Sequence, residues 1–220
     1  MNNQFELEKF DVAKFDSILS RGLSKGLGKL NGQVCIEAAI CQTLGLPHGD
    51  DPGCVSAAVR AFKITLNDAQ WSSPQARAAG LRNLGLAQLG SKGVVDDSAF
   101  ATLLSEKIIR VLIPKLFREL FPKNAKCLAA ADACEREGTE STARAARAAW
   151  SAARAADAAA RAAAWTAARA AADAAWTVTM AAKAAKAADA AGDSYLVLAA
   201  NLALDVLREL KSPGVVLLSQ

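Results

Sequence analysis

Apolar residues recur along most of the chain at intervals of three or four, the spacing that places them on one face of an α-helix. The segment 11–22, for example, carries Val12, Phe15, Ile18 and Leu19 at this spacing. Helical signals of this kind dominate and predict an all-α protein. The predicted helices cover 11–22, 34–44, 55–62, 74–90, 97–120, 125–137 and a last stretch that ends near residue 210.

Residues typical of helix ends mark several of these boundaries. Ser73 is a good N-cap because its hydroxyl can accept a free backbone N–H, and Pro74 follows at the first helical position. Gly90 is expected to close that helix. Asp97 is expected to cap the next helix, and Pro114 is expected to kink it because proline removes one backbone hydrogen bond.

Two segments depart from the helical pattern. Residues 63–71, Lys-Ile-Thr-Leu-Asn-Asp-Ala-Gln-Trp, are the one stretch predicted to be extended. The tail 212–220 is short and apolar, so we expect it to dock on its own chain or on a neighbouring subunit. Gly138 marks a change of composition, which predicts a helical domain over 1–137 and an alanine-rich helical region with a final helix over 138–220.

The second region has the most unusual composition of the chain. Thirty of the forty-nine residues in 143–191 are alanine, and none is glycine or proline. Alanine has the highest helix propensity but little side chain to bury, so such a helix packs only where another backbone comes close. We expect a hairpin or stacked helices with breaks at 165–166 and 176–179, and one long arm is the alternative. Asp193 or Ser194 is expected to cap the last helix.

On a helical projection of this region, every non-alanine residue from Trp150 to Trp176 falls on one half of the surface. Two interpretations stay open. In the first, alanine ridges pack on neighbouring helices while tryptophan and arginine side chains cover the outside or a second contact layer. In the second, arginine beside tryptophan forms a stacking surface for a small, nucleotide-like anionic ligand or for an acidic protein partner. The residues expected to make such contacts are Arg154, Arg161, Trp165 and Arg169.

The charge distribution limits the range of partners. The chain has 26 basic and 22 acidic residues, a formal net charge of +4. The segment 141–191 holds seven basic and three acidic residues, and therefore the whole of this excess. Asp157 and Asp173 interrupt the basic stripe, and the charge is too small for strong duplex binding, so nucleic acid is not an expected partner.

The cysteines and the hydropathy indicate the compartment. Five cysteines, an odd number, and a start without the features of a signal peptide are typical of a cytoplasmic protein with reduced thiols. No run of eighteen uncharged apolar residues occurs, so we expect no membrane span. Cys127 and Cys134, seven apart, are expected to be small buried residues. The alanine faces favour a homo-oligomer.

Chemically capable side chains gather in 32–54, around the only histidine of the chain. One hypothesis is a thiol nucleophile, because Cys35 opens a predicted helix, where the helix dipole lowers the pKa of a thiol. His48 would serve as its base, oriented by Asp50 or Asp51. Gly-Gln-Val-Cys at 32–35 resembles the nucleophile position of papain-like hydrolases, although those families draw their histidine from a distant strand.

A second hypothesis is a zinc site, because Cys35, Cys41, His48 and Cys54 offer three sulfurs and a nitrogen. Their spacing lacks the close cysteine pairs of structural zinc sites. In addition, Cys35 and Cys41 would lie about 120° apart around one helix. We therefore predict no metal and no cofactor.

A third hypothesis is structural: Cys35 and Cys41 fill a small core, and the loop 46–54 is a tight turn whose aspartates cap the next helix. A loop so rich in glycine, proline and aspartate beside the only histidine is also where we expect a ligand to bind. Glu37, on the same short helix as Cys35, could turn towards it. The expected contact residues are His48, Asp50 and Asp51, with Trp71 as an aromatic wall.

Three short segments carry a resemblance: Gly-Gln-Val-Cys-Ile-Glu-Ala-Ala at 32–39, Leu-Pro-His-Gly-Asp-Asp-Pro at 46–52 and Leu-Asn-Asp-Ala-Gln-Trp-Ser-Ser at 66–73. Through them the stretch from about 19 to 119 resembles uncharacterised hypothetical proteins of bacteria and phages with variable alanine-rich tails. The resemblance covers less than half of the chain. It implies a microbial origin and brings no activity with it.

These patterns lead to one principal hypothesis and one alternative for the function. The principal hypothesis is a non-enzymatic binding or interaction protein, which sequesters a small anionic ligand or occupies a protein partner. The alternative is a cysteine-dependent hydrolase or transferase that uses Cys35, His48 and Asp51.

Overall fold

The computed structural model describes residues 7–157 and 189–219, and their side chains over 7–152 and 192–219. These residues form an all-α fold, in which the only strand-like contacts described are isolated bridges of Val34 with Leu23 and Gly28. In chain order the elements are η1 (Leu7–Lys9), α1 (Val12–Leu19), α2 (Ile36–Thr43), α3 (Ala57–Asn67), α4 (Pro74–Ala87), α5 (Asp97–Lys107), the π-helical turn η2 (Ile108–Leu112), α6 (Ile113–Leu120), α7 (Ala125–Glu137), α8 (Glu140–Asp157), α10 (Asp189–Glu209) and η3 (Pro213–Ser219).

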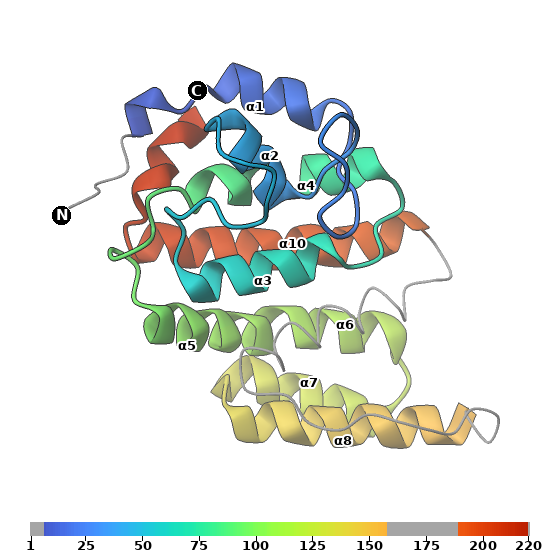
Figure 1. Cartoon of the computed structure of the whole chain (residues 1–220). Coiled ribbons are helices and arrows are strands. Elements are labelled where there is room, and N and C mark those ends of the chain that lie inside the picture. The colour runs from blue at the N-terminus through green and yellow to red at the C-terminus, as the bar shows by residue number, and fades with distance from the viewer. Residues whose placement is uncertain (1–6, 158–188, 220) are drawn as a thin grey trace.

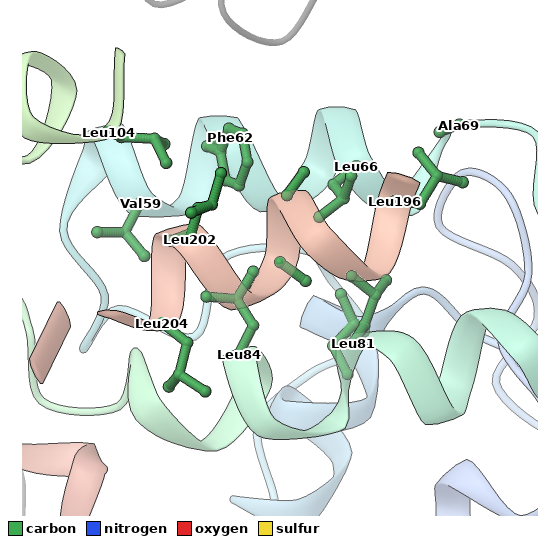
Figure 2. Close-up of a cluster of buried hydrophobic side chains, with 14 of the residues drawn as sticks. Val59, Phe62, Leu66, Ala69, Leu81, Leu84, Leu104, Leu196, Leu202 and Leu204 are labelled. Carbon is green, nitrogen blue, oxygen red and sulfur yellow. The ribbon is translucent and has the colours of Figure 1, made fainter. Parts of the chain in front are cut away.

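Helix α10 runs through the middle of the molecule (Figure 1). It packs against α4 on one side and against α3 and α5 on the other, and α7 and α8 lie beyond α5 and α6. Figure 2 shows leucines of α10 between Val59, Phe62 and Leu66 of α3 and Leu81 and Leu84 of α4. Because α10 has neighbours on most sides, it is apolar around most of its circumference. Its buried residues are Tyr195, Leu196, Ala199, Ala200, Leu202, Ala203, Leu204, Val206 and Leu207.

The start of α10 differs from the prediction. The helix begins at Asp189, so Gly192 lies inside it and neither Asp193 nor Ser194 is its cap. The side chain of Asp193 instead accepts hydrogen bonds from the backbone N–H of Ser72, at 2.9 Å, and from its hydroxyl. This aspartate ties the first turns of α10 to the segment before α4. The division at residue 137 stays a prediction, and α10 packs into helices that precede it.

The segment 63–71 is not extended as predicted, because its first half continues α3 to Asn67. The buried residues Phe62, Lys63, Leu66 and Asn67 follow one another at helical spacing. Two of these four are polar, which hides the helical period when only apolar residues are counted. The prediction was therefore wrong because Lys63 and Asn67, which take part in the polar contacts described below, lie on the buried face of α3.

The N-caps of two helices also differ from the prediction. Asp96, not Asp97, caps α5, since its carboxylate accepts the backbone N–H of Ala99 at 2.7 Å. The carboxylate of Asp97 turns instead to the start of α3, where it accepts the N–H of Ala58 at 3.0 Å and the hydroxyl of Ser56. Asp97 therefore caps a helix that begins forty residues earlier in the chain.

A kink is predicted at Pro114, and the π turn η2 interrupts the α-helical hydrogen bonding just before it. A residue at 114 would normally donate its N–H to the carbonyl of Arg110, and proline cannot. The wider π turn ends just before this proline. Arg110 lies in that turn, and its guanidinium reaches the end of α7, where such a cation satisfies free carbonyls. It donates hydrogen bonds to the carbonyls of Glu135 at 3.0 Å, Arg136 at 2.6 Å and Glu137 at 2.9 Å.

Helix α8 places Trp150 in contact with neighbouring elements and not on the outside, which is one of the two positions that the helical projection leaves open. Trp150 is 7% exposed and packs against Phe117 and Phe121, with ring centroids 5.7 and 5.2 Å apart respectively. Ala146, at 1% exposed, lies on the same buried face, and Ala143 and Ala149 pack partly buried beside it, so alanines and the larger tryptophan share this face. The exposed residues of α8 include Ala145, Ala148 and Ala152. The predicted breaks at 165–166 and 176–179 lie outside the described residues.

The C-terminal tail docks on its own chain, which is one of the two predicted outcomes. The backbone N–H of Gly214 donates to the carbonyl of Leu89 at 2.9 Å, and the hydroxyl of Ser212 donates to that of Ala87 at 2.6 Å. The backbones approach so closely that a Cβ on Gly214 would lie 2.2 Å from the carbonyl oxygen of Leu86. Among the described helices, none combines the length and apolarity needed to cross a bilayer.

Candidate functional site

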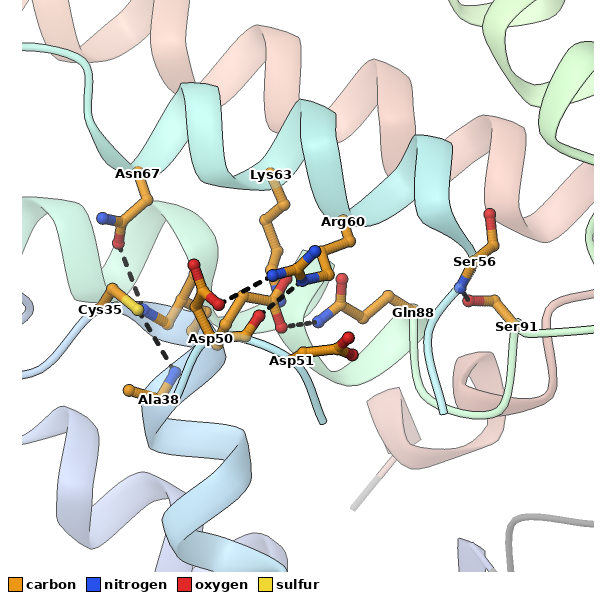
Figure 3. Close-up of polar contacts among 12 residues, drawn as sticks. Cys35, Ala38, Asp50, Asp51, Ser56, Arg60, Lys63, Asn67, Gln88 and Ser91 are labelled. Atoms are coloured by element: carbon orange, nitrogen blue, oxygen red, sulfur yellow. Dashed lines mark hydrogen bonds and ion pairs between the residues drawn. The ribbon is translucent and has the colours of Figure 1, made fainter. Parts of the chain in front are cut away.

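A buried polar cluster lies where α2, α3 and the end of α4 meet (Figure 3). Lys63 of α3 and Glu37 of α2 form an ion pair, Nζ to Oε1 2.9 Å, and both side chains are 0% exposed. Gln88, the C-cap of α4, donates from Nε2 to Glu37 Oε2 at 3.0 Å. Three segments far apart in sequence are thus joined by one carboxylate, and Glu37 turns inward, not towards a ligand at the surface.

Burial controls the electrostatics of this pair. Loss of water raises the pKa of the Glu37 carboxyl although Lys63 opposes the change, and it lowers the pKa of the Lys63 amine although Glu37 opposes it. The pair has no net charge whether the proton is on the Lys63 amine or on the Glu37 carboxyl. A neutral total is what allows two ionisable groups to stay inside the core.

The loop between α2 and α3 covers the cluster and is fastened by its own aspartates. Arg60 of α3 donates to the backbone carbonyl of Asp50 at 2.6 Å and to its carboxylate at 2.8 Å. Asp51 accepts the N–H of Gly53 at 2.9 Å, as in an Asx turn. Both aspartates were predicted ligand contacts, and the structure uses both to shape the loop. Neither caps α3, since Asp97 has that role.

A second loop, 20–35, is held from the inside by polar side chains. Asn67 accepts the N–H of Ile36 at 3.2 Å and donates to the carbonyl of Ser24 at 3.0 Å. Asp68 accepts the N–H of Gly26 at 2.8 Å, and buried Arg77 donates to the carbonyl of Leu23 at 2.6 Å. These contacts fix an irregular backbone without the ladder of a sheet.

Gly28 allows the second loop to close on itself. Its φ is +77°, and a Cβ at this position would lie 2.3 Å from the carbonyl oxygen of Gln33. Only glycine combines the left-handed backbone with so close an approach. The fold of the loop is therefore specified by its sequence as well as by the anchors beneath it.

The two loops meet at the surface. His48 Nε2 lies 3.4 Å from the carbonyl oxygen of Gly28, and Gln42 donates to the carbonyl of Leu30 at 3.1 Å. Three leucines of these two loops are exposed to solvent: Leu27 by 41%, Leu30 by 53% and Leu46 by 41%. They are half of the large exposed hydrophobic residues in the described part of the chain. We call the area formed by Leu27, Leu30 and Leu46 the two-loop surface.

The thiol of Cys35 does not have the lowered pKa that its place at a helix start predicted. Cys35 is indeed the N-cap of α2, and its Sγ accepts the N–H of Ala38 at 3.3 Å. Burial nevertheless raises the pKa of this thiol, because desolvation outweighs the backbone hydrogen bonds that lower it. Burial likewise raises the pKa of Cys41 to about 11. No hydrogen bond joins the described side chains of Cys35 and His48.

The other predicted contacts separate into three groups. Within 7–152 and 192–219 no three His, Cys, Asp or Glu side chains are grouped to hold a metal ion, so Cys35, Cys41, His48 and Cys54 are not brought together as zinc ligands. Trp71 is a core residue and not an exposed wall, since it is 6% exposed and its indole N–H donates to the carbonyl of Leu66 at 3.0 Å. The side chains of Arg154, Arg161, Trp165 and Arg169 lie outside the described ones.

The most informative residues of this region were not predicted from the sequence. Lys63 lies in a segment predicted to be extended. Gln88 lies near the end of a predicted helix, and nothing in the sequence around it indicates its contact with Glu37. A signal for the two-loop surface did exist in residues 20–33, where leucines alternate with glycines and lysines outside any helical period. Comparison of the chain with known protein families, curated proteins and solved structures finds no match.

Proposed function

We propose that this chain is a non-enzymatic binding protein whose contact area is the two-loop surface. The observation that carries the proposal is the exposure of Leu27, Leu30 and Leu46 on loops that are fixed from within. Leucines held in water by an ordered backbone are unfavourable to the free protein. A loop that is already ordered also loses little conformational entropy when a partner covers it.

The burial of the reactive groups supports binding over the cysteine-dependent alternative. A nucleophile must approach its substrate to about 3–3.5 Å. The Cys35 residue is only 5% exposed, and the Lys63 amine is fully enclosed and paired with Glu37. A thiol with a raised pKa is also mostly protonated, and hence unreactive, near neutral pH.

The exposed area of the leucines also gives an estimate of their contribution to the binding free energy. Full burial of a leucine contributes about 1.5–3 kcal/mol, so covering a side chain that is about half exposed contributes about 1 kcal/mol. Three such side chains together amount to about 3 kcal/mol, or about a hundredfold in affinity. Protruding side chains of this kind suit a macromolecular partner better than a small anion, which needs a concave site.

The experiment is a selection of phage-displayed random linear peptides on the wild-type protein. Peptides that are enriched should bind L27S/L30S/L46S about a hundredfold more weakly, because the apolar contact area is lost. They should bind V94S/V216S unchanged, since these two exposed valines lie on other segments of the chain. Circular dichroism and urea unfolding of each variant verify the fold.

Two results would overturn this proposal. One is the absence of any enriched peptide above the background of an uncoated surface. The other is equal binding of the enriched peptides to the wild type and to the leucine variant. The cysteine-dependent alternative predicts instead that Cys35→Ser abolishes a turnover that L27S/L30S/L46S retains.

A further inference from the structure

Three cations of the loop that carries Leu27 and Leu30 have no acidic partner among the residues that the structure describes. Arg21, Lys25 and Lys29 are exposed in the stretch 20–33, which contains no aspartate or glutamate. None of the three forms an ion pair within 4.0 Å with a residue that the structure describes. The chain is otherwise rich in such pairs, as Arg60, Arg82 and Arg118 illustrate.

Three carboxylates on or bonded to the two loops have partners within the protein. Asp68 accepts the N–H of Gly26, and Asp50 pairs with Arg60. Asp51 accepts the N–H of Gly53. A charged partner that approaches the leucines therefore meets cations without acidic partners on the loop 20–33, and the exposed carboxylates of Asp50 and Asp51 on the other loop.

We infer that the two-loop surface binds an acidic peptide segment with apolar residues, supplied by a partner protein; this inference rests on the proposed function. The apolar side chains of the segment cover Leu27, Leu30 and Leu46, and its carboxylates pair with Lys25 and Lys29. This arrangement matches the general anatomy of interfaces, in which an apolar centre is surrounded by a polar rim. The rim charges accelerate association and select against basic segments.

The residues of the two loops favour a peptide over a nucleic acid or a membrane. Neither 20–33 nor 44–54 contains phenylalanine, tyrosine or tryptophan, so the aromatic platform on which unpaired bases stack is missing from them. Asp50 and Asp51 are exposed beside His48. They would repel a phosphate backbone or an anionic bilayer laid flat over both loops. A peptide can place its carboxylates at the lysines alone.

The test uses the displayed peptides that depend on the three leucines. These peptides should carry a net negative charge, and replacing their acidic residues with glutamine should weaken binding to the wild type about tenfold in fluorescence anisotropy. The variant K25E/K29E should lose a similar factor. The control K123E/K126E makes the same change of net charge at two exposed lysines near the start of α7 and should bind as the wild type does. Added salt should weaken binding to the wild type more than to K25E/K29E.

The outcomes separate this inference from the proposed function. Leucine-dependent peptides that are neutral or basic, or that bind K25E/K29E as tightly as the wild type, would overturn the acidic partner and leave the proposed function intact. Tighter leucine-dependent binding to phosphatidylglycerol vesicles or to single-stranded RNA would overturn it as well. Peptides that bind independently of the leucines would overturn both.

Discussion

Replacing Lys63 with methionine should destabilise the protein strongly, because it leaves the Glu37 carboxylate without a cation in the core. Both side chains are 0% exposed, and no bulk water can replace the lost ammonium group. Removing one partner of a buried pair costs about 3–5 kcal/mol. For a chain of this size, that corresponds to a fall in Tm on the order of 10 °C.

The double variant E37M/K63M should be more stable than either single variant. With both charges gone, the remaining cost is the Gln88 amide, whose Nε2 loses the carboxylate acceptor that it has now. An unsatisfied buried donor costs about 1–3 kcal/mol, so the triple variant E37M/K63M/Q88M should recover most of that loss. Urea unfolding followed by circular dichroism measures all four variants. The losses in the free energy of unfolding of E37M and K63M, added together, should exceed the loss in E37M/K63M by about 2 kcal/mol or more.

The pH dependence of K63M provides an independent measurement. Burial already raises the pKa of Glu37 in the intact protein, and removal of the opposing cation raises it further. Stability linked to a raised pKa is present below the unfolded value of about 4.3 and is lost as the pH rises through the folded value. The deficit of K63M relative to the wild type should therefore be smaller at pH 5 than at pH 8. A loss below about 1 kcal/mol, additive single effects or a deficit independent of pH would refute the buried pair.

Three further expectations concern other parts of the molecule. The Cys41 thiol, with its pKa raised to about 11, should react with iodoacetamide at pH 8 about a hundredfold more slowly in the folded protein than in urea; equal rates would mean that it is accessible and ionised. Gly214→Ala should cost about 1–3 kcal/mol in thermal unfolding because its Cβ would lie 2.2 Å from the Leu86 carbonyl oxygen, whereas Gly49→Ala, with its nearest atom at 3.8 Å, should stay within about 0.5 kcal/mol. Trp150→Ala should raise hydrogen exchange in α8 by about a hundredfold and leave α10 protected, and equal protection of α8 in both proteins would contradict the aromatic contact.

The helices that could be predicted from the sequence are those whose ends depend on neighbouring residues. The cap of α4 at Ser73 acts over three residues, and the end of α7 at Gly138 needs only a left-handed backbone. The predictions failed where the contact is distant. Asp97 caps α3, and Asp193 bonds to Ser72, and neither partner can be identified from local spacing. A residue typical of caps was recognised in both cases, but the helix or segment that it serves was not.

The same difference between local and distant effects explains the candidate site. The composition of 46–54 predicts a compact loop, and the structure has a loop there; the contact of His48 with the second loop could not be predicted. The helix start at Cys35 was also predicted, and it favours a lower pKa of that thiol. Burial is a property of the whole fold, and it reverses the direction. The residues that neighbour Cys35 in the sequence do not show how deeply the fold buries its thiol.

Helix α3 connects the two loops, and under the proposed function this connection would give the buried pair a role beyond stability. Arg60, Lys63 and Asn67 lie three and four residues apart, so they share one face of the helix. Arg60 holds Asp50 on the first loop, Lys63 holds Glu37 beneath that loop, and Asn67 holds the start of α2 and the second loop. A single rigid helix therefore sets the distance between Leu46 on one loop and Leu27 and Leu30 on the other. An interface loses affinity when its parts shift by about an ångström, so under the proposed function the polar face of α3 would matter to binding as much as the exposed leucines.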